Sequence, residues 1–468
     1  MADGRVIEPY RGKHGWEGWG TCLYWWANTE LGRRDDLARV LFGLDPVTVR
    51  VDGGADVTLP GLGLNVVRYN LGACTFGAVD GRRMAVSPHI PRRKQIEGFW
   101  GGGDRWDWSA DANQRAALAK ARGAGADTFE LASVAPLWWM TGNGNPCGAA
   151  EPRADNLADP AGHATYLATV ARYARDHWGV RFASVEPFNE PSAHWWVADG
   201  RQEGCSFTHA AQRAVIPLLR AELDRRGLTD VRVAASDEYG FGGAAATWAA
   251  FPEPVRRQVG RVNVHGYQGK PDDPGPRRRL RAAIGDMPLW QSEYGDGDAS
   301  GLTLARNLSA DLHHLRPTGW VLWQPVEHSN WGLFGGRFTP DRDAITPDDH
   351  GTLAASVTGV RDAYHVLAQY TRHVRPGARI LDSGHRSTVA AWDGGRLVLV
   401  TVNPSAEPVE LTYELGKFRR VGETARMWTT APGRWYERDE APVREGRLTT
   451  HHAPSSVTTF EIDGVDRG

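Results

Sequence analysis

The stretch "SVEPFNEPSAHWW" (residues 184–196) brings two glutamates, Glu186 and Glu190, to the end of an apolar run that predicts a buried strand. Proline is excluded from the centre of a sheet because it has no N–H to donate. The strand must therefore end within this stretch, with its polar side chains gathered at that end. Polar groups at the carboxyl ends of buried strands are typical of active sites in (β/α)₈ barrels.

Short apolar runs alternate with helical patterns from about residue 15 to 365. Eight such runs predict an α/β fold, a (β/α)₈ TIM barrel. A doubly wound sheet is the alternative, but it needs a glycine-rich turn after an early strand, and "GLGLN" (61–65) precedes its strand. Helices are predicted at residues 112–125, 163–178 and 208–227. The predicted strands cover residues 20–27, 64–72, 127–135, 182–188, 231–236, 261–267, 288–294 and 320–326.

The strands also show the alternation that a closed barrel requires, in which successive side chains face the interior and the helices in turn. In the sixth predicted strand, His265 and Tyr267 share one face and valines occupy the other. In the second, Arg68 and Asn70 share the inward face. Polar groups in a row are costly in a dry core, so these faces are expected to lead up to a polar site.

The pattern changes after residue 370, where helical periodicity stops and short alternating strands follow. This predicts an antiparallel β-sandwich. Residues 1–14 are too few for a domain and are expected to add a strand to it. We therefore expect a barrel domain over 15–368 and a sandwich domain formed by 1–14 and 369–468. The predicted sandwich strands cover residues 387–392, 396–403, 409–415, 423–430 and 456–462.

The composition limits the classes of partner and ligand that are expected for the chain. The net charge of −2 excludes a global field that would attract nucleic acid or a membrane surface. The chain has 20 tryptophans, six of them in three adjacent pairs. About half are expected to serve packing, and the flat apolar face and N–H of an indole in the others suit a sugar ring. Four widely spaced cysteines have no C-x-x-C spacing, so neither a metal site nor a cofactor is expected.

The chain has no apolar run of transmembrane length and no signal-peptide pattern at its start. We expect a secreted enzyme if a signal peptide has been removed, and a cytoplasmic one otherwise. A monomer without a nucleic-acid or membrane partner is expected, acting on an oligo- or polysaccharide.

Two carboxylates at different strand ends, Glu190 and Glu293, suit cleavage of a glycosidic bond. One acid protonates the leaving oxygen, and the other attacks the anomeric carbon or activates water. A lone glutamate at a strand end is more often a cap or an ion-pair partner, so the pair carries the prediction. Glu186 would lie about 13 Å below Glu190 on the same strand face, at two steps of roughly 6.5 Å each. We expect it to be buried and paired with an arginine such as Arg68.

Other residues at the strand ends are candidates for substrate binding or support. Asn189 is a short donor for a sugar hydroxyl. Tyr267 would donate to an ionised nucleophile. His265 is expected to be a wall residue, and Arg68 would hold Glu293 or pair with Glu186. The remaining candidates are Asn70, Trp25, Trp138, Trp195 and Trp323.

With these motifs the chain resembles glycoside hydrolase family 30, within the clan of retaining (β/α)₈ glycosidases. The motifs that carry the resemblance run in order along almost the whole chain, and they include "GWGTCLYWWAN" (18–28), "LNVVRYNLGA" (64–73), "VEPFNEP" (185–191), "LWQSEYGDGD" (289–298) and "SSVTTFEI" (455–462). The resemblance implies that Glu190 is the acid/base and Glu293 the nucleophile of a double displacement. It also implies carboxyl groups about 5–5.5 Å apart.

Within the family, the chain is most similar to the endo-β-1,6-galactanase branch, which cuts side chains of arabinogalactan proteins. One departure is Tyr24, where that branch has alanine, and it could alter a subsite. The alternatives are an exo-acting or different-sugar member, namely a β-1,6-glucanase, xylanase, β-fucosidase or galactofuranosidase, or a non-catalytic carbohydrate-binding protein. A metal-dependent barrel enzyme with another substrate is a further alternative. The sequence leaves endo and exo action open.

Overall fold

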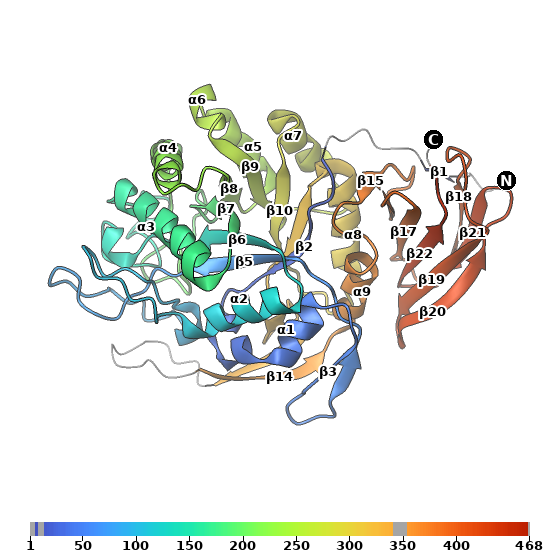
Figure 1. The fold of residues 1–468 in the computed structure, drawn as a ribbon, viewed down its shortest axis with the longest axis horizontal. Coiled ribbons are helices and arrows are strands. Elements are labelled where there is room, and N and C mark those ends of the chain that lie inside the picture. The colour runs from blue at the N-terminus through green and yellow to red at the C-terminus, as the bar shows by residue number, and fades with distance from the viewer. Residues whose placement is uncertain (1–4, 8–13, 340–352, 467–468) are drawn as a thin grey trace.

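The computed structural model describes residues 5–7, 14–339 and 353–466. Eight parallel strands close into a barrel in the order β10-β11-β2-β5-β6-β7-β8-β9 (Figure 1). The predicted (β/α)₈ barrel is confirmed. Its strands are β2 (Gly18–Cys22), β5 (Val66–Leu71), β6 (Thr128–Ser133), β7 (Phe182–Glu186), β8 (Arg232–Glu238), β9 (Val259–His265), β10 (Leu289–Tyr294) and β11 (Gly319–Leu322).

Helices cover the outside of the barrel, and their starts follow from local sequence. The Asp159 side chain accepts from the Gly162 N–H at the start of α3, where Pro160 is the first helical residue. The Thr208 hydroxyl accepts from the Ala211 N–H at the start of α4. The α-helices are α1 (Asp35–Phe42), α2 (Ala112–Ala124), α3 (Pro160–Tyr173), α4 (His209–Arg225), α5 (Phe241–Ala250), α6 (Glu253–Arg256), α7 (Gly275–Ile284), α8 (Leu302–Ala310) and α9 (Asp362–Thr371).

Short helices of other types complete the barrel. Two π-helical turns continue α3 and α8, and four 3-10 turns lie in loops. The π turns are η5 (Ala174–Trp178) and η6 (Asp311–Leu315), and the 3-10 turns are η1 (Trp26–Asn28), η2 (Glu30–Arg33), η3 (Arg92–Lys94) and η4 (Trp138–Met140).

The first barrel strand ends earlier than the predicted range 20–27. β2 stops at Cys22, and Trp25 has a φ of 61° before η1 begins. A left-handed residue cannot continue a strand. Trp25 and its neighbour Tyr24 therefore lie in the turn above β2, at the same end of the barrel as the other strand-end residues.

The C-terminal strands form two sheets, shown in orange and red in Figure 1. A six-stranded antiparallel sheet has the order β15-β16-β17-β22-β19-β20, and a three-stranded sheet has the order β1-β18-β21. As expected, a strand near the N-terminus joins them, because β1 pairs with β18. The strands are β1 (Arg5–Val6), β15 (Arg379–Leu381), β16 (Thr388–Trp392), β17 (Arg396–Asn403), β18 (Val409–Glu414), β19 (Thr424–Ala431), β20 (Arg434–Pro442), β21 (Arg447–His452) and β22 (Ser456–Asp463).

Several strands were not predicted. β20 is mostly exposed and rich in charge, as suits an edge strand, so it shows no hydrophobic alternation. The barrel also carries the hairpin of β3 and β4 and a small sheet of β12, β13 and β14. These strands are β3 (Val47–Val49), β4 (Val57–Leu59), β12 (Val326–Glu327), β13 (Phe334–Thr339) and β14 (Ala354–Val360).

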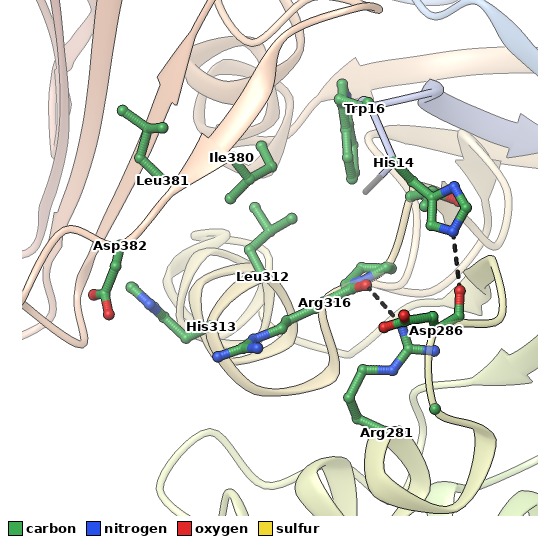
Figure 2. Close-up of a pocket in the computed structure, with 14 residues that line it drawn as sticks. His14, Trp16, Arg281, Asp286, Leu312, His313, Arg316, Ile380, Leu381 and Asp382 are labelled. Carbon is green, nitrogen blue, oxygen red and sulfur yellow. Dashed lines mark hydrogen bonds between the residues drawn. The ribbon is translucent and has the colours of Figure 1, made fainter. Parts of the chain in front are cut away.

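A cavity of about 260 Å³ lies where the barrel meets the C-terminal sheets (Figure 2). Leu312 of η6 faces Ile380 of β15 across it, and the ring of His14 bonds to the Asp286 carbonyl oxygen. Its charged lining residues include both arginines and aspartates. It contains neither Glu190 nor Glu293.

The four cysteines are all buried and free. Across the residues that the structure describes, every helix is too short or too polar to span a bilayer.

Candidate active site

A second cavity, of about 360 Å³, opens at the carboxyl ends of the barrel strands. It contains both predicted carboxylates together with aromatic and polar side chains. Its lining residues are Tyr24, Trp25, Val134, Asn189, Glu190, Trp195, Gln202, Tyr239, Tyr267, Glu293, Trp323, Glu327, His328, Ser329 and Trp331. This arrangement places a carboxylate pair within a hollow lined by flat, apolar faces.

Glu190 lies in a tight turn just beyond β7. Its φ of 47° is in the left-handed region, which a non-glycine residue occupies only when neighbours hold it there. Its N–H donates to the Asp237 carbonyl at 2.9 Å, and its own carbonyl accepts from the Trp196 indole at 2.8 Å. The prolines on either side end the strand and restrict the turn. The chain thus fixes the backbone of Glu190 before its side chain makes any contact.

Glu293 reaches the cavity because β10 is irregular. Trp290 faces the barrel interior, so regular alternation would turn Glu293 outward. The register of β10 against β9 shifts between Gln291 and Glu293, which redirects the side chain inward. The Tyr267 hydroxyl donates to Glu293 Oε1 at 2.8 Å, and an Arg68 nitrogen lies 3.4 Å from Oε2. Burial raises the pKa of Glu293 to about 7, against the effect of the cations beside it.

The two carboxylates are close together. One oxygen of Glu190, one oxygen of Glu293 and a ring nitrogen of His265 all lie within 4.8 Å of one another. A retaining glycosidase has carboxyl groups about 5–5.5 Å apart, and an inverting one needs about 6.5–9.5 Å to admit water. The spacing fits the retaining class.

His265 bridges three carboxylates at the end of β9. Its Nδ1 lies 2.9 Å from Glu190 Oε1 and 3.5 Å from Glu293 Oε1, and its Nε2 lies 3.1 Å from Asp237 Oδ2. Burial acts to lower the pKa of His265, but the negative charges of Glu293 and Asp237 outweigh it and hold the pKa well above its usual value. These charges favour the imidazolium form, in which Nδ1 donates to Glu190 Oε1 and Nε2 lies at ion-pair distance from Asp237.

The three side chains Glu190, His265 and Glu293 also have the spacing of a metal site. Each ring nitrogen of His265 already faces a carboxylate of the chain, however, with Nδ1 beside Glu190 and Nε2 beside Asp237. The donor set therefore fits a charge-balanced hydrogen-bond network better than a metal centre.

Arg68 lies in the barrel interior and contacts several members of the hydrogen-bond network around Glu293. Its guanidinium donates to Glu130 Oε1 at 2.9 Å, to Asp237 Oδ2 at 2.6 Å and to the Ser292 carbonyl at 2.9 Å. With its contact to Glu293, this arginine meets three carboxylates. Of the two partners predicted for it, the structure has Glu293.

The prediction for Glu186 was right in its burial and wrong in its arginine partner, and the face drawn from Glu186 through Phe188 to Glu190 was wrong beyond Glu186. Glu186 is fully buried, but Arg68 does not contact it, and its Oε1 accepts only the Phe188 N–H at 3.3 Å. Burial raises the pKa of Glu186 well above its usual range, with Asp237 and Glu130 adding to the rise. Because β7 ends at Glu186, the alternation that was extended to Glu190 stops there, and Phe188 packs in the outer core instead.

The remaining predicted residues divide into two groups. Five line the cavity: Asn189, Tyr267, Trp25, Trp195 and Trp323. Two do not. Asn70 is buried below, near Glu203. Trp138 is buried in η4, where its indole donates to the Thr75 hydroxyl at 2.6 Å. The predicted placement of Trp138 at the site was wrong because η4 turns its ring into the packed loop.

Sequence reasoning missed four residues at or below the site, namely Asp237, Glu130, Glu327 and Trp331. Asp237 follows the predicted strand 231–236 directly, so the rule that found Glu190 could have found it. Glu130 lies in the middle of β6, where an apolar strand gives no signal for a charge. Glu327 ends the short strand β12 and directly follows the predicted strand 320–326, whereas Trp331 lies in the irregular segment after it.

Comparison with known proteins identifies the family. A family model described as O-glycosyl hydrolase family 30 matches residues 8–246. The endo-β-1,6-galactanase of Hypocrea rufa is 41% identical over 481 residues, covering 98% of this chain and 94% of that protein. The chain belongs to O-glycosyl hydrolase family 30. As a family 30 member it is a glycoside hydrolase, as the carboxylate pair predicted.

Two further proteins are similar to the chain at lower identity. An exo-β-1,6-galactobiohydrolase of Bifidobacterium longum subsp. longum is 21% identical, covering 87% of this chain and 35% of that protein. The catalytic domain of the family 30 xylanase C from Talaromyces cellulolyticus has a TM-score of 0.70 at 16% identity, covering 98% of this chain and all of that one. At this identity the xylanase likeness shows the shared fold alone.

Proposed function

We propose that this family 30 chain is a retaining endo-β-1,6-galactanase. The observation that carries the proposal is the 41% identity, over 98% of the chain, to a protein named for that activity. The close carboxylate pair in the cavity supports the retaining mechanism. The substrate is a polysaccharide of β-1,6-linked galactose.

In the first step, a Glu293 oxygen attacks the anomeric carbon while Glu190 gives its proton to the departing glycosidic oxygen. The electrons of the broken C–O bond stay with that oxygen, and a covalent glycosyl-enzyme forms. In the second step Glu190 takes a proton from water, which attacks the same carbon and releases Glu293. Tyr267 and Arg68 each contact one oxygen of Glu293, which supports its ionised form before attack.

Endo action is supported by two exposed tryptophans, one that contacts Glu190 and one that contacts Tyr267, the hydrogen-bond partner of Glu293. Trp195 contacts Glu190 and is 37% exposed. Trp331 lies beside Tyr267 and is 41% exposed. Open aromatic faces on both sides suit a chain that continues in both directions from the bond that is cut.

The test is incubation with β-1,6-galactan, β-1,6-glucan, glucuronoxylan and aryl β-glycosides, with product lengths resolved over time. We expect a mixture of galacto-oligosaccharides early in the reaction, and none with Glu293→Gln. A wild type inactive on every β-glycan would contradict the proposal and favour a carbohydrate-binding protein. Release from glucan or xylan alone would overturn the sugar assignment.

Exo action is the second candidate, because the more distant relative from Bifidobacterium is named as an exo-enzyme. The same time course separates the two modes. Products of one fixed short length from the first time point indicate exo action, whereas a spread of lengths indicates endo action.

A further inference from the structure

Two adjacent tryptophans in the loop after β7 both donate to Glu190. The buried Trp196 donates its indole N–H to the Glu190 carbonyl at 2.8 Å, which fixes the backbone. Trp195 donates its indole N–H to the Glu190 side chain, at Oε2, at 3.1 Å. Trp195 also lines the cavity, so one residue touches both the proposed acid and the space where substrate binds.

The two oxygens of the Glu190 carboxyl meet different donors. Oε1 faces the Nδ1 of the cationic His265 at 2.9 Å, and Oε2 faces the Trp195 indole. If Oε1 carried the proton of Glu190, a second hydrogen-bond donor would lie beside the N–H of the imidazolium. Oε2 can instead accept from the neutral indole and still carry its own proton, because a hydroxyl oxygen has two lone pairs. The surroundings therefore favour the proton on Oε2.

We propose that Trp195 is the positioning residue for the acid/base, holding Glu190 Oε2 as the oxygen that protonates the departing sugar, and that its exposed ring forms the subsite for that sugar. The inference rests on the proposed function. The glycosidic oxygen must lie within hydrogen-bond reach of Oε2, and Oε2 lies beside the Trp195 indole. The sugar that leaves is then a hydroxylated pyranose whose apolar face packs on that indole.

The ring contacts of Trp195 agree with this role. His194, Trp196 and Tyr239 all meet it at steep angles, of 72°, 69° and 67°. None of the described ring contacts of Trp195 is a parallel stack, and 37% of the residue is exposed, so part of its ring surface is available to a ligand. Elsewhere in the chain Trp100 and Trp106 stack on each other at 3°, and those faces are occupied.

The test compares leaving groups. Trp195→Phe keeps a flat ring and removes the N–H donor. The second-order rate kcat/KM is measured on aryl β-galactosides whose phenols span pKa values from about 4 to 10, and on β-1,6-galactan. We expect at least a tenfold loss on galactan and on the poorest aryl leaving group. With dinitrophenol, which leaves without protonation, the loss should be less than twofold.

Trp331→Phe is the matched control, since it changes the other exposed tryptophan of the same cavity and makes no described contact with Glu190. We expect it to lower kcat/KM by the same factor for every leaving group. Thermal unfolding of both variants checks that the fold is kept. Equal losses for all leaving groups in Trp195→Phe, or no loss at all, would overturn the positioning role.

A failure of the proposed sugar is separable from a failure of the inference. If the wild type hydrolyses aryl β-glucosides or β-xylosides and no galactoside, the galactan assignment is wrong. The leaving-group series is then built on the accepted sugar. If kcat/KM depends more steeply on the pKa of the leaving group in Trp195→Phe than in the wild type, the positioning role is supported. An unchanged dependence overturns it.

Discussion

His265 lies between the carboxylates of Glu190 and Glu293 and places one positive charge beside both of them. It lies within 3.5 Å of both Glu190 and Glu293, and its charge lowers the pKa of Glu293 against the effect of burial. The nucleophile must be ionised to attack, so this charge extends activity toward acidic pH. The sequence predicted a wall residue at this position, and its electrostatic role became visible only from the neighbours.

Replacing His265 with glutamine keeps a hydrogen-bonding side chain and removes the charge. The pKa of Glu293 should then rise, and the acid limb of kcat/KM against pH should move to higher pH by about 1 unit. The sign follows because Glu293 is lost as a nucleophile below its pKa. The measurement is a pH profile with an activated aryl glycoside. An acid limb that stays in place would contradict a cationic His265.

The substitution Tyr24→Phe tests whether a buried hydroxyl without a partner lowers the stability of the fold. The buried hydroxyl of Tyr24 has no described hydrogen-bond partner, whereas the Tyr364 hydroxyl donates to the Pro60 carbonyl at 2.7 Å. Tyr24→Phe removes a group whose burial is uncompensated, so the free energy of unfolding should stay equal or rise by up to about 1 kcal/mol. Tyr364→Phe should lower it by about 1 kcal/mol. Urea unfolding of both variants measures this, and a fall for Tyr24→Phe as large as that for Tyr364→Phe would show that the hydroxyl is bonded.

At the scale of elements, the barrel strands build a charged layer below the carboxylate pair. Glu130 of β6 accepts from Arg68 of β5 and from Asn263 and Arg261 of β9. These side chains point inward by strand parity and are fully buried. The layer fixes Arg68, and through it Glu293, without touching substrate.

Glu130→Gln should therefore destabilise the barrel strongly. Removing one partner from a buried ion cluster typically costs about 3–5 kcal/mol, because the opposite charges are left unpaired. The exposed pair of Glu253 and Arg257 provides the matched control, and Glu253→Gln should cost less than about 1 kcal/mol. Denaturant unfolding gives both values. Equal costs for the two variants would mean that the buried layer adds no stability.

Helices and strands could be predicted where apolar residues recur at the spacing of a buried face. They could not be predicted where a turn or a register shift interrupts that spacing. All eight barrel strands carried the signal. The turn at Glu190 and the irregularity at Glu293 did not, because a left-handed residue and a register shift depend on tertiary contacts. Parity therefore placed Glu186 correctly in the barrel interior and failed four residues later. Glu130 had no signal, since its partners come from strands far away in sequence.

For the whole molecule, the six-stranded sheet joins the two parts. One of its faces contributes Val400 and Val457 to the same apolar core as the barrel helices. Its other face packs with Ile7 and Tyr413 against the three-stranded sheet. Residue 368, the end proposed for the barrel domain, lies inside α9, which contacts β19, β20 and β22. We propose that 15–368 forms one domain and 1–14 with 369–468 the other, and that they are stable only together.

A shared core predicts one cooperative transition. In scanning calorimetry, the full chain should unfold in a single peak, with calorimetric and van't Hoff enthalpies that agree. Two resolved peaks would mean that the barrel and the sheets unfold independently, and that their shared face contributes little to stability.

The most direct test of the central claim is to trap the covalent intermediate. A 2-deoxy-2-fluoro-β-galactosyl fluoride carries a good leaving group, and its 2-fluoro substituent slows hydrolysis of the glycosyl-enzyme. Mass spectrometry of the digested protein should find one fluorogalactosyl group, attached to Glu293 within the peptide that contains "LWQSEYGDGD" (289–298). An adduct on Glu190, or turnover of substrate with no adduct on either carboxylate, would contradict a double displacement at Glu293.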